Sequence, residues 1–463
     1  MDANGREFVR GVLAKNFDVA NIRELFKARR SRLSRGVDRV DVDSFERHGF
    51  NALDGLADKM IGGTFKFSPY LEKLVSKGRG RNPRLIARAT VRDKLVLWAM
   101  KDALHEILPG MVPSKLPNQV VREFVAYLAE RAGHSVVRVD IESFYDTIDR
   151  GELLSLLNSA IGEVGFVQVI EGSIASPIVP AAYRKSEKSS YEQLAGVPQG
   201  LPTSNFLANV YMIPFDEKVS AEFRAYVRYV DDMVLIVPKD EAASTYNYIV
   251  DGLRKIGLSA NRIKSKIYSY EDTFEFLGYE VSSGKVGPKR GSFDKFLRSV
   301  AALFNGLRRK ALPNRRIFSD WDDKEFADLF IDELNELITG AVSKGRQYGW
   351  VFYFNESNDL TRFALVDSVV KRFSRRTDLL TNAQRSRIKR CVRAVHESRH
   401  SKGGGYVKNY DRIDSVGDKI KFLVRYAYLG RDEVVSAARV EEIYDSVLEQ
   451  RLSRLERDVG FIS

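Results

Sequence analysis

The sequence predicts an α+β protein, and three observations lead to this fold class. The segment 226–237 is apolar except near its centre, where Asp231 and Asp232 stand together, which indicates two buried strands joined by a tight turn. A second apolar segment, 135–140, has the pattern of a buried strand that ends in a carboxylate. Helix-length stretches separate these segments, and beyond Gly287 the apolar residues follow a period of about 3.6 residues. We therefore expect a mixed catalytic core followed by helices.

Three domains are expected along the chain. Residues 1–134 are basic and mostly helical, with a helix from Arg92 through Leu108, and residues 135–285 hold the predicted strands. Residues 286–463 are predicted to be an all-helical extension, in which one helix ends at Gly340. The apolar faces of two of its helices would be formed by Phe326, Phe330, Leu334, Leu337 and Ile338, and by Val440, Ile443, Tyr444, Val447, Leu448, Leu452 and Leu455.

Composition favours a polyanionic partner. The 463 residues include 74 Lys and Arg against 62 Asp and Glu, a formal charge of +12, although a basic protein that binds no nucleic acid is the alternative interpretation. Cys391 is the single cysteine, which excludes intrachain disulfides and Cys-rich zinc sites and favours a reducing cytosol. No apolar run approaches the roughly 20 residues that span a bilayer, and the N-terminus lacks a signal-peptide pattern. We expect a cytoplasmic protein with no membrane partner.

The carboxylates at the strand ends predict a metal centre. Asp140, Asp231 and Asp232 would lie on neighbouring strands, and Ile141 offers a backbone carbonyl beside the first of them. Such oxygen ligands suit Mg²⁺, and Mn²⁺ would also fit. Two ions about 3.5 to 4 Å apart would activate an attacking 3′ hydroxyl and stabilise departing pyrophosphate. The alternative is a plain hairpin tip, because Asp is a common turn residue.

Two segments that follow the predicted strands carry candidate substrate contacts. Tyr145 lies five residues beyond Asp140, where its bulk would exclude a ribose 2′ hydroxyl, although core packing is the other interpretation. In the turn-rich loop 196–205, Gln199 and Gly200 would approach a nucleotide or template closely, and a helix that begins near Ser204 would favour a phosphate.

Basic side chains supply further candidates. Lys264 follows a helix-to-strand turn and could protonate the leaving pyrophosphate, although a lone surface lysine is the commoner meaning. The window 73–94 could bind a triphosphate and the template backbone, unless it is only a solvated basic loop. Its cations are Lys73, Lys77, Arg79, Arg81, Arg84, Arg88, Arg92 and Lys94.

In order along the chain, these segments resemble the motifs of reverse transcriptases, the RNA-directed DNA polymerases with a right-hand fold of fingers, palm and thumb. Residues 229–232, Tyr-Val-Asp-Asp, are similar to the catalytic hairpin of that family, and 196–209 to its Pro-Gln-Gly segment. Residues 261–264 are similar to its pyrophosphate-side lysine turn, and 276–279 to its primer-grip hairpin. The resemblance covers about residues 34–285 and is far more specific than any one motif.

The resemblance implies roles for individual residues. Asp140, Asp231 and Asp232 would be metal ligands, Tyr145 the gate against ribonucleotides, and Arg84 and Arg88 the contacts to the triphosphate. The expected partners are an RNA template, the DNA product and dNTPs, with a homo-oligomer left open.

Within the family, the extension around 334–354 resembles that of the bacterial unknown-group and abortive-infection enzymes. That likeness implies antiphage defence, with synthesis from a companion noncoding RNA or without a template. Alternatives are a group II intron-type maturase and a non-catalytic RNA-binding protein of polymerase descent.

Two motifs in the extension are candidates for further sites. Some members of the abortive-infection group prime from a protein hydroxyl, and Tyr406 or Tyr410, next to the Gly-rich loop 402–406, would be candidates, with ordinary surface tyrosines as the favoured alternative. His396 and His400 form a His-Glu-x-x-His pattern, but neighbouring arginines disfavour zinc there.

Overall fold

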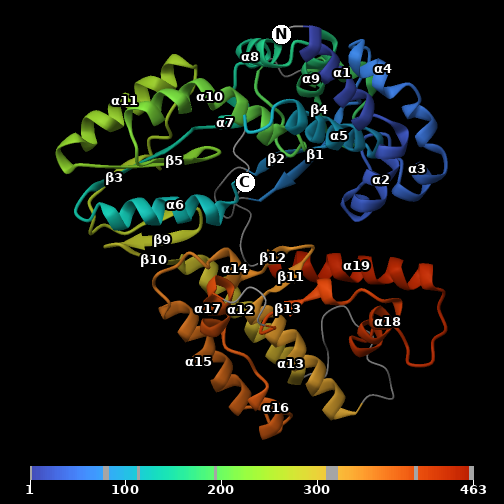
Figure 1. Cartoon of the computed structure of the whole chain (residues 1–463), viewed down its shortest axis with the longest axis vertical. Helices are drawn as coiled ribbons and strands as arrows, with labels where there is room; N and C mark the ends of the chain where they lie inside the picture. The colour runs from blue at the N-terminus through green and yellow to red at the C-terminus, as the bar shows by residue number, and fades with distance from the viewer. Residues whose placement is uncertain are drawn as a thin grey trace. The chain divides into compact units, whose positions relative to one another are not determined.

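The computed structural model describes residues 3–76, 83–111, 115–191, 195–308, 322–400 and 405–457 (Figure 1). The chain forms two compact units, each made of two stretches of sequence. The first comprises Met1–Lys115 and Val137–Ile267, and the second Leu116–Val136 and Tyr268–Ser463. The mixture of helices and sheets confirms the predicted α+β class. Within the described residues, no helix combines the length and the apolar character needed to cross a membrane.

The N-terminal part of the first unit is helical, as expected. Its helices are α1 (Ala3–Asn16), α2 (Val19–Arg29), α3 (Val42–His48), α4 (Leu56–Ile61) and α5 (Val91–Ile107). Thr90 caps α5 by accepting a hydrogen bond from the Asp93 amide, so the predicted helix from Arg92 is confirmed to within one residue at each end. The same unit contains a three-stranded sheet with the order β2-β1-β4. Its strands are β1 (Tyr70–Val75), β2 (Arg84–Arg88) and β4 (Ile178–Val179).

The predicted strands form a four-stranded sheet with the order β5-β6-β3-β7. The strands β3 (Ser135–Asp140), β5 (Tyr226–Tyr229) and β6 (Asp232–Val237) lie where the apolar pattern placed them, and β7 (Lys266–Tyr268) completes the sheet. Helices α8 (Arg150–Ile161), α9 (Val164–Ala175), α10 (Ser204–Glu222) and α11 (Ala242–Lys255) connect them, and a short helix, α7 (Phe144–Thr147), follows β3.

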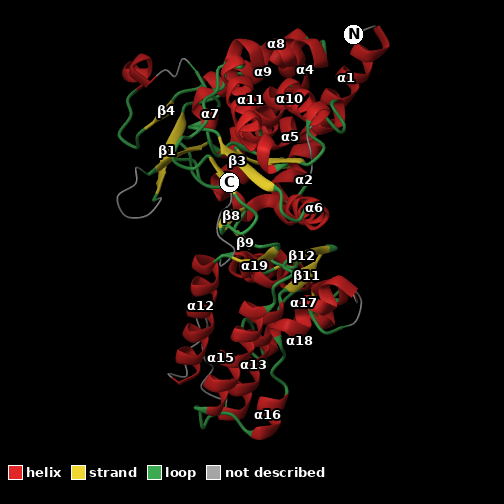
Figure 2. Cartoon of the chain, turned by 90° about the vertical axis from the view of Figure 1, so that its left-hand side faces the viewer, coloured by secondary structure: helices red, strands yellow, loops and turns green. Residues whose placement is uncertain are grey.

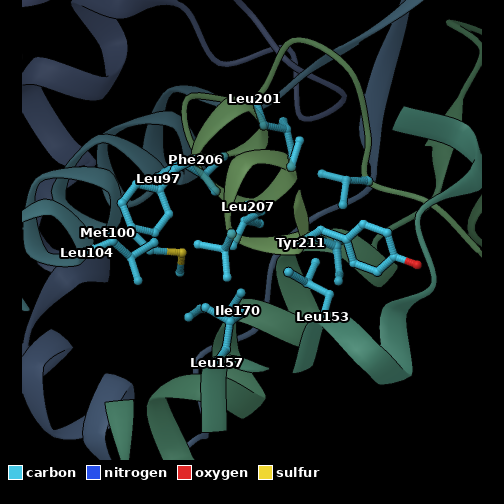
Figure 3. Close-up of a cluster of buried hydrophobic side chains, with 14 of the residues drawn as sticks. Leu97, Met100, Leu104, Leu153, Leu157, Ile170, Leu201, Phe206, Leu207 and Tyr211 are labelled. Atoms are coloured by element: carbon cyan, nitrogen blue, oxygen red, sulfur yellow. The ribbon is translucent and has the colours of Figure 1, made fainter. Parts of the chain in front are cut away.

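Side chains from four helices of this unit pack into one core, shown in Figure 3. One side of β6 adds Met233, Leu235 and Val237 to the same core. Burial of a large aliphatic side chain stabilises by about 1.5–3 kcal/mol, so this cluster holds the sheet edge that carries the carboxylates. The labelled members are Leu97, Met100, Leu104, Leu153, Leu157, Ile170, Leu201, Phe206, Leu207 and Tyr211.

The second unit begins with α6 (Pro117–Glu130) and a meander of three antiparallel strands, β8 (Phe274–Phe276), β9 (Tyr279–Ser282) and β10 (Lys285–Pro288). Leu277 and Gly278 both have positive φ in the turn between β8 and β9, so the predicted hairpin at 276–279 is confirmed. Helices α12 (Arg290–Arg308), α13 (Asp323–Thr339) and α15 (Thr361–Arg375) then run side by side in both views (Figure 2).

The extension continues with α14 (Trp350–Tyr353), α16 (Asn382–Ser386), α17 (Cys391–His400), α18 (Val416–Arg425) and α19 (Ala437–Glu456). The predicted helix stop is confirmed, because α13 ends at Gly340, which has φ 75°. All five predicted apolar residues of α13 are buried. Of the seven on α19, Ile443 and Leu452 are only half-buried.

One detail of the extension differs from the prediction of an all-helical region. The strands β11 (Ala341–Ser343), β12 (Arg346–Tyr348) and β13 (Lys408–Asn409) form a small sheet in the order β12-β11-β13. Lys344 and Gly345 both have positive φ, which is the geometry of a two-residue hairpin turn. Strands of two or three residues are too short to show an alternating apolar pattern, so this sheet could not be predicted from the sequence.

Candidate active site

The hairpin between β5 and β6 presents its two aspartates from a strained turn. Tyr229 pairs with Asp232 across the hairpin, so Val230 and Asp231 form the turn itself. Val230 has φ 57°, a region that β-branched residues rarely adopt. Arg228 Nη1 donates to the Val230 carbonyl at 2.8 Å and its Nε to Asp216 at 2.8 Å, which holds the turn in this shape.

A backbone hydrogen bond joins the hairpin to the end of β3. The Ile141 amide donates to the Asp231 carbonyl at 2.9 Å, and the Glu142 amide donates to the Ser259 carbonyl at 2.8 Å. The structure therefore brings Asp140, Ile141 and Asp231 together. Burial, followed by the negative charge of Asp140, raises the pKa of Asp231 from 3.8 to about 6.

Lys264 lies directly on the first carboxylate. Its Nζ donates to both oxygens of Asp140, each at 2.9 Å, and the Asp140 side chain is almost fully buried. The Asn261 amide donates to the Asp140 carbonyl at 2.8 Å, and the Asn261 side chain accepts from the amides of Ile263 and Lys264. The turn after α11 thus aims Lys264 at the end of β3.

The third carboxylate, Asp232, is held by Arg138. Arg138 Nε and Nη2 donate to its two oxygens at 2.9 and 2.8 Å, and both side chains are mostly buried. Burial nevertheless raises the pKa of Asp232, with Arg138 opposing the rise. Our sequence reasoning missed Arg138. The sequence feature that could have identified Arg138 is its position two residues before Asp140, because residues two apart on a strand lie on the same face.

Tyr145 lies beside this cluster, on the short helix α7. Ser143 precedes that helix in a left-handed conformation, with φ 48°. Burial first, and then the charge of nearby Asp231, raises the pKa of Tyr145 to about 12, so its hydroxyl is neutral at physiological pH. The residue that sequence reasoning placed near the ribose is therefore next to the carboxylates.

The loop before α10 packs against both Tyr145 and β2. The Val197 amide donates to the Tyr145 carbonyl at 2.7 Å, and the Ala87 amide donates to the Gln199 carbonyl at 2.7 Å. Gly200 has φ 96°, and a Cβ there would lie 2.4 Å from Ile86 Cγ2. Only glycine permits this close approach.

Residues of β2, α7, β4 and the loop before α10 line a small cavity of about 160 Å³. Arg84, Asp146, Ile178, Pro198 and Gln199 are among its lining residues. Two predicted substrate contacts, Arg84 and Gln199, thus share one cavity beside the helix of Tyr145.

Arg88 and its cationic neighbours form the remainder of the predicted basic window. Within the part of the chain that the structure describes, Arg88 Nε is buried and has no hydrogen-bond partner. Burial lowers the pKa of Lys94, and the charges of Arg32, Lys73 and Arg88 lower it further, so these side chains are close together. Lys77, Arg79 and Arg81 lie outside the described residues.

The donor set fits a divalent cation at two of the three carboxylates. In residues 3–457, apart from the undescribed gaps, no three His, Cys, Asp or Glu side chains form a ready metal cluster. Asp140 and Asp231 repel each other, as the raised pKa of Asp231 indicates, and the Lys264 ammonium stands where a cation would relieve that repulsion. Asp232 would have to exchange Arg138 for a metal.

The structure also places the two candidate tyrosines and the His-Glu-x-x-His pattern of the extension. Tyr410 is 2% exposed, and its hydroxyl donates to Glu336 at 2.6 Å, so it is not an accessible surface tyrosine. The hydroxyl of Tyr406 accepts from the Arg390 amide at 2.6 Å, and residues 401–404 of the Gly-rich loop lie outside the described residues. His396 and His400 lie on α17 with ring centroids 4.7 Å apart, and Arg393 donates to Glu397 between them.

One part of the chain is similar to a known protein family. Residues 75–281 match the family model described as reverse transcriptase (RNA-dependent DNA polymerase). Protein YkfC of Escherichia coli strain K12 is 24% identical over 296 residues, which cover 53% of this chain and 75% of that protein. An uncharacterized 91 kDa protein in the cob intron of Schizosaccharomyces pombe is 23% identical over 317 residues, or 52% of this chain and 38% of that protein.

Among solved structures, the telomerase of Candida albicans in complex with a TWJ fragment of telomeric RNA aligns with a TM-score of 0.40. The alignment has 11% sequence identity and covers 91% of this chain and 69% of that chain.

Proposed function

Because the chain carries a reverse transcriptase domain over residues 75–281, a domain of the RNA-directed DNA polymerase class, we propose that it adds dNTPs to a DNA end by two-metal phosphoryl transfer on an RNA template. The observation that carries this proposal is the 2.9 Å hydrogen bond from the Ile141 amide to the Asp231 carbonyl. It joins the end of β3, which carries Asp140, to the hairpin turn that carries Asp231, with Tyr145 near that turn.

In this proposal Asp140, Asp231 and the Ile141 carbonyl hold two Mg²⁺ ions, with Asp232 as a further ligand once Arg138 is displaced. Bound there, the ions would lower the pKa of the attacking 3′ hydroxyl and neutralise charge on the leaving pyrophosphate. Mn²⁺ would fit the same oxygen donors.

The chain's own cations and loop supply the nucleotide contacts. Arg84 and Arg88 bind the triphosphate, and the buried, unpartnered Nε of Arg88 supports this assignment. Gln199 and Gly200 place backbone against the nucleotide or template, because Gly200 lets the loop meet β2 closely. The Nζ of Lys264 lies 2.9 Å from Asp140 Oδ1, and Lys264 donates a proton to the departing pyrophosphate.

The biological role we propose is antiphage defence in the cytoplasm, with a companion noncoding RNA as template or with untemplated synthesis. The formal charge of +12 and the largely helical extension support an RNA-bound enzyme of this kind.

A second candidate is an intron-type maturase that also reverse transcribes. The similarity to the protein in the cob intron of S. pombe favours it. The two roles differ in the RNA that the protein retains, because a maturase would carry intron RNA and splice it.

The test is to purify the full chain with co-expressed RNA and to add Mg²⁺ and labelled dNTPs. Asp140→Ala and Asp231→Ala should abolish synthesis while the thermal melt stays cooperative, and Asp240→Ala, at an exposed position of the same unit, should not. A product complementary to a bound RNA supports templated synthesis, and a random or homopolymeric product supports untemplated synthesis. A product from Asp231→Ala equal to wild type would contradict the assigned site.

A further inference from the structure

The helical extension contains a second cavity, of about 460 Å³, within a single compact unit. It is formed by α13, the segment between α16 and α17, β13 with its flanking residues, and the end of α18 (Figure 1). Its volume lies in the range of pockets that bind small molecules.

Five cationic side chains line this cavity. They are Arg387, Lys389, Lys408, Arg412 and Arg425, against two carboxylates, Asp332 and Glu336. The cations come from three separate stretches of the chain, so their convergence is produced by the fold and not by one basic run.

Both carboxylates are already engaged. Arg425 Nε and Nη2 donate to Asp332 Oδ2 at 2.8 and 2.5 Å. Glu336 accepts from the Tyr410 hydroxyl at 2.6 Å and is paired with Arg451, a buried arginine outside the cavity lining. Arg387 is likewise paired, with Asp328 at 2.7 Å. Among the ion pairs of the described residues, neither acid of the lining is paired with Lys408 or Lys389.

Lys408 is the lining cation that a bound anion would stabilise most. Its Nζ lies 5.5–5.7 Å from the ring centroids of Tyr410, Phe422 and Tyr426, and among the hydrogen bonds formed by the described residues Nζ donates none. Burial lowers the pKa of Lys408, although the charges of Glu336 and Asp332 oppose that shift. A half-buried ammonium that makes no hydrogen bond to the described residues keeps its donors available for a bound acceptor.

We propose that this pocket binds the phosphate group of a free nucleotide, with Lys408 as the central contact. A phosphate offers several charged acceptor oxygens, which Lys408, Lys389 and Arg412 can share, and Lys and Arg are the usual partners of such groups. A cavity of about 460 Å³ lies in the size range of sites for a single small ligand, whereas a continuous strand requires a groove that extends beyond one nucleotide.

The proposal is independent of polymerase activity and can be tested by binding. We would measure labelled ATP by equilibrium dialysis against the full chain in EDTA, in an Arg88→Ala background that weakens the triphosphate contacts of the first unit. Lys408→Met keeps an apolar stem over the three rings and removes the charge. Lys421→Met, on α18 with a side chain 81% exposed, is the matched control.

Loss of the charged contact in Lys408→Met should raise the Kd at least about tenfold, while Lys421→Met leaves it unchanged and Lys408→Arg stays within a few-fold. Inorganic phosphate should compete with ATP, and adenosine should not. Should Lys408→Met fail to melt cooperatively, Arg412→Gln is judged by the same criteria.

The proposal is overturned if wild type shows no saturable ATP binding, if Lys408→Met binds like wild type, or if adenosine competes as well as ATP. Binding of a 5′-phosphorylated oligonucleotide without ATP binding would also overturn it, because the ligand would then be a nucleic acid strand.

Discussion

Lys264 donates hydrogen bonds to both carboxylate oxygens of Asp140, and each bond is 2.9 Å long. Arg138 does the same for Asp232. Among the ion pairs of the described residues, Asp231 takes part in none, so it is the carboxylate of the three whose charge the protein itself does not compensate. Because Asp140 and Asp232 are paired and Asp231 is not, we expect substitutions of these residues to have different effects on stability.

Replacing Asp231 by asparagine should stabilise the metal-free protein. The pKa of Asp231 is raised from 3.8 to about 6, so the folded chain binds this proton more tightly than the unfolded chain does. Its contribution is therefore most favourable in acid and is lost as pH rises from about 4 through about 6, at a cost on the order of 3 kcal/mol above that range. Asp231→Asn should raise the free energy of unfolding at pH 7.5 by roughly 1–3 kcal/mol in EDTA.

The free energy of unfolding is measured with urea at pH 7.5 and at pH 5. At pH 5 the increase caused by Asp231→Asn should be about half of that at pH 7.5. Asp240→Asn, at an exposed site of the same unit, should show neither the gain nor its dependence on pH. A lower stability of Asp231→Asn at pH 7.5 would mean that the carboxylate is compensated in solution.

Asp232→Asn should stabilise the protein less than Asp231→Asn does. Burial raises the pKa of Asp232, which favours the neutral residue, but the change also removes the charged partner of Arg138, whose side chain is 17% exposed, and this loss opposes the gain. A double-mutant cycle with Arg138→Gln should give a coupling energy above about 1 kcal/mol. The exposed pair Arg254 and Asp251 is the control, with an expected coupling below about 0.5 kcal/mol, and equal values for the two pairs would contradict the prediction.

Gly196 should tolerate no side chain. It has φ 79°, and a Cβ there would lie 2.7 Å from the carbonyl oxygens of both Tyr145 and Asp146. Gly196→Ala should cost about 2 kcal/mol or more and should impair dNTP addition, because the turn that carries Tyr145 must move. Gly172→Ala, within α9 and with nothing within 4 Å of the added Cβ, should be neutral or stabilising in thermal unfolding. Primer extension by Gly196→Ala at the wild-type rate would contradict this account.

The elements around the site could be predicted because their signals are local. The apolar runs predicted β3, β5 and β6, and the Asp pair predicted the turn between the last two. The motif order also predicted a fold with fingers and palm, which the match of residues 75–281 confirms. Roles of single residues in that fold stay predictions.

The charge pairing of the site could not be predicted, because it depends on contacts between distant segments. Arg138 and Asp232 are 94 residues apart, and they meet because β6 lies beside β3. Tyr410 was expected near the surface from its glycine-rich neighbourhood. The structure buries it instead, because Glu336 and Arg451 from two other helices bind its hydroxyl.

Tyr145 should control the choice between deoxynucleotides and ribonucleotides. It is near enough to Asp231 for that charge to raise its pKa, and the bulk of an aromatic side chain at this place would meet a ribose 2′ hydroxyl. Tyr145→Ala should lower the ratio of kcat/KM for dNTP to that for rNTP by about ten- to a hundredfold, as expected when one steric contact is removed from a pocket.

Tyr145→Phe separates bulk from the hydroxyl. The pKa of Tyr145 is about 12, so the hydroxyl is neutral at assay pH and its removal takes no charge from the site. We therefore expect Tyr145→Phe to keep the wild-type ratio, measured by single-nucleotide extension with each substrate. If Tyr145→Ala also kept that ratio while still extending with dNTPs, the selectivity would reside in another residue, because the space left by the ring would then not be where the 2′ hydroxyl lies.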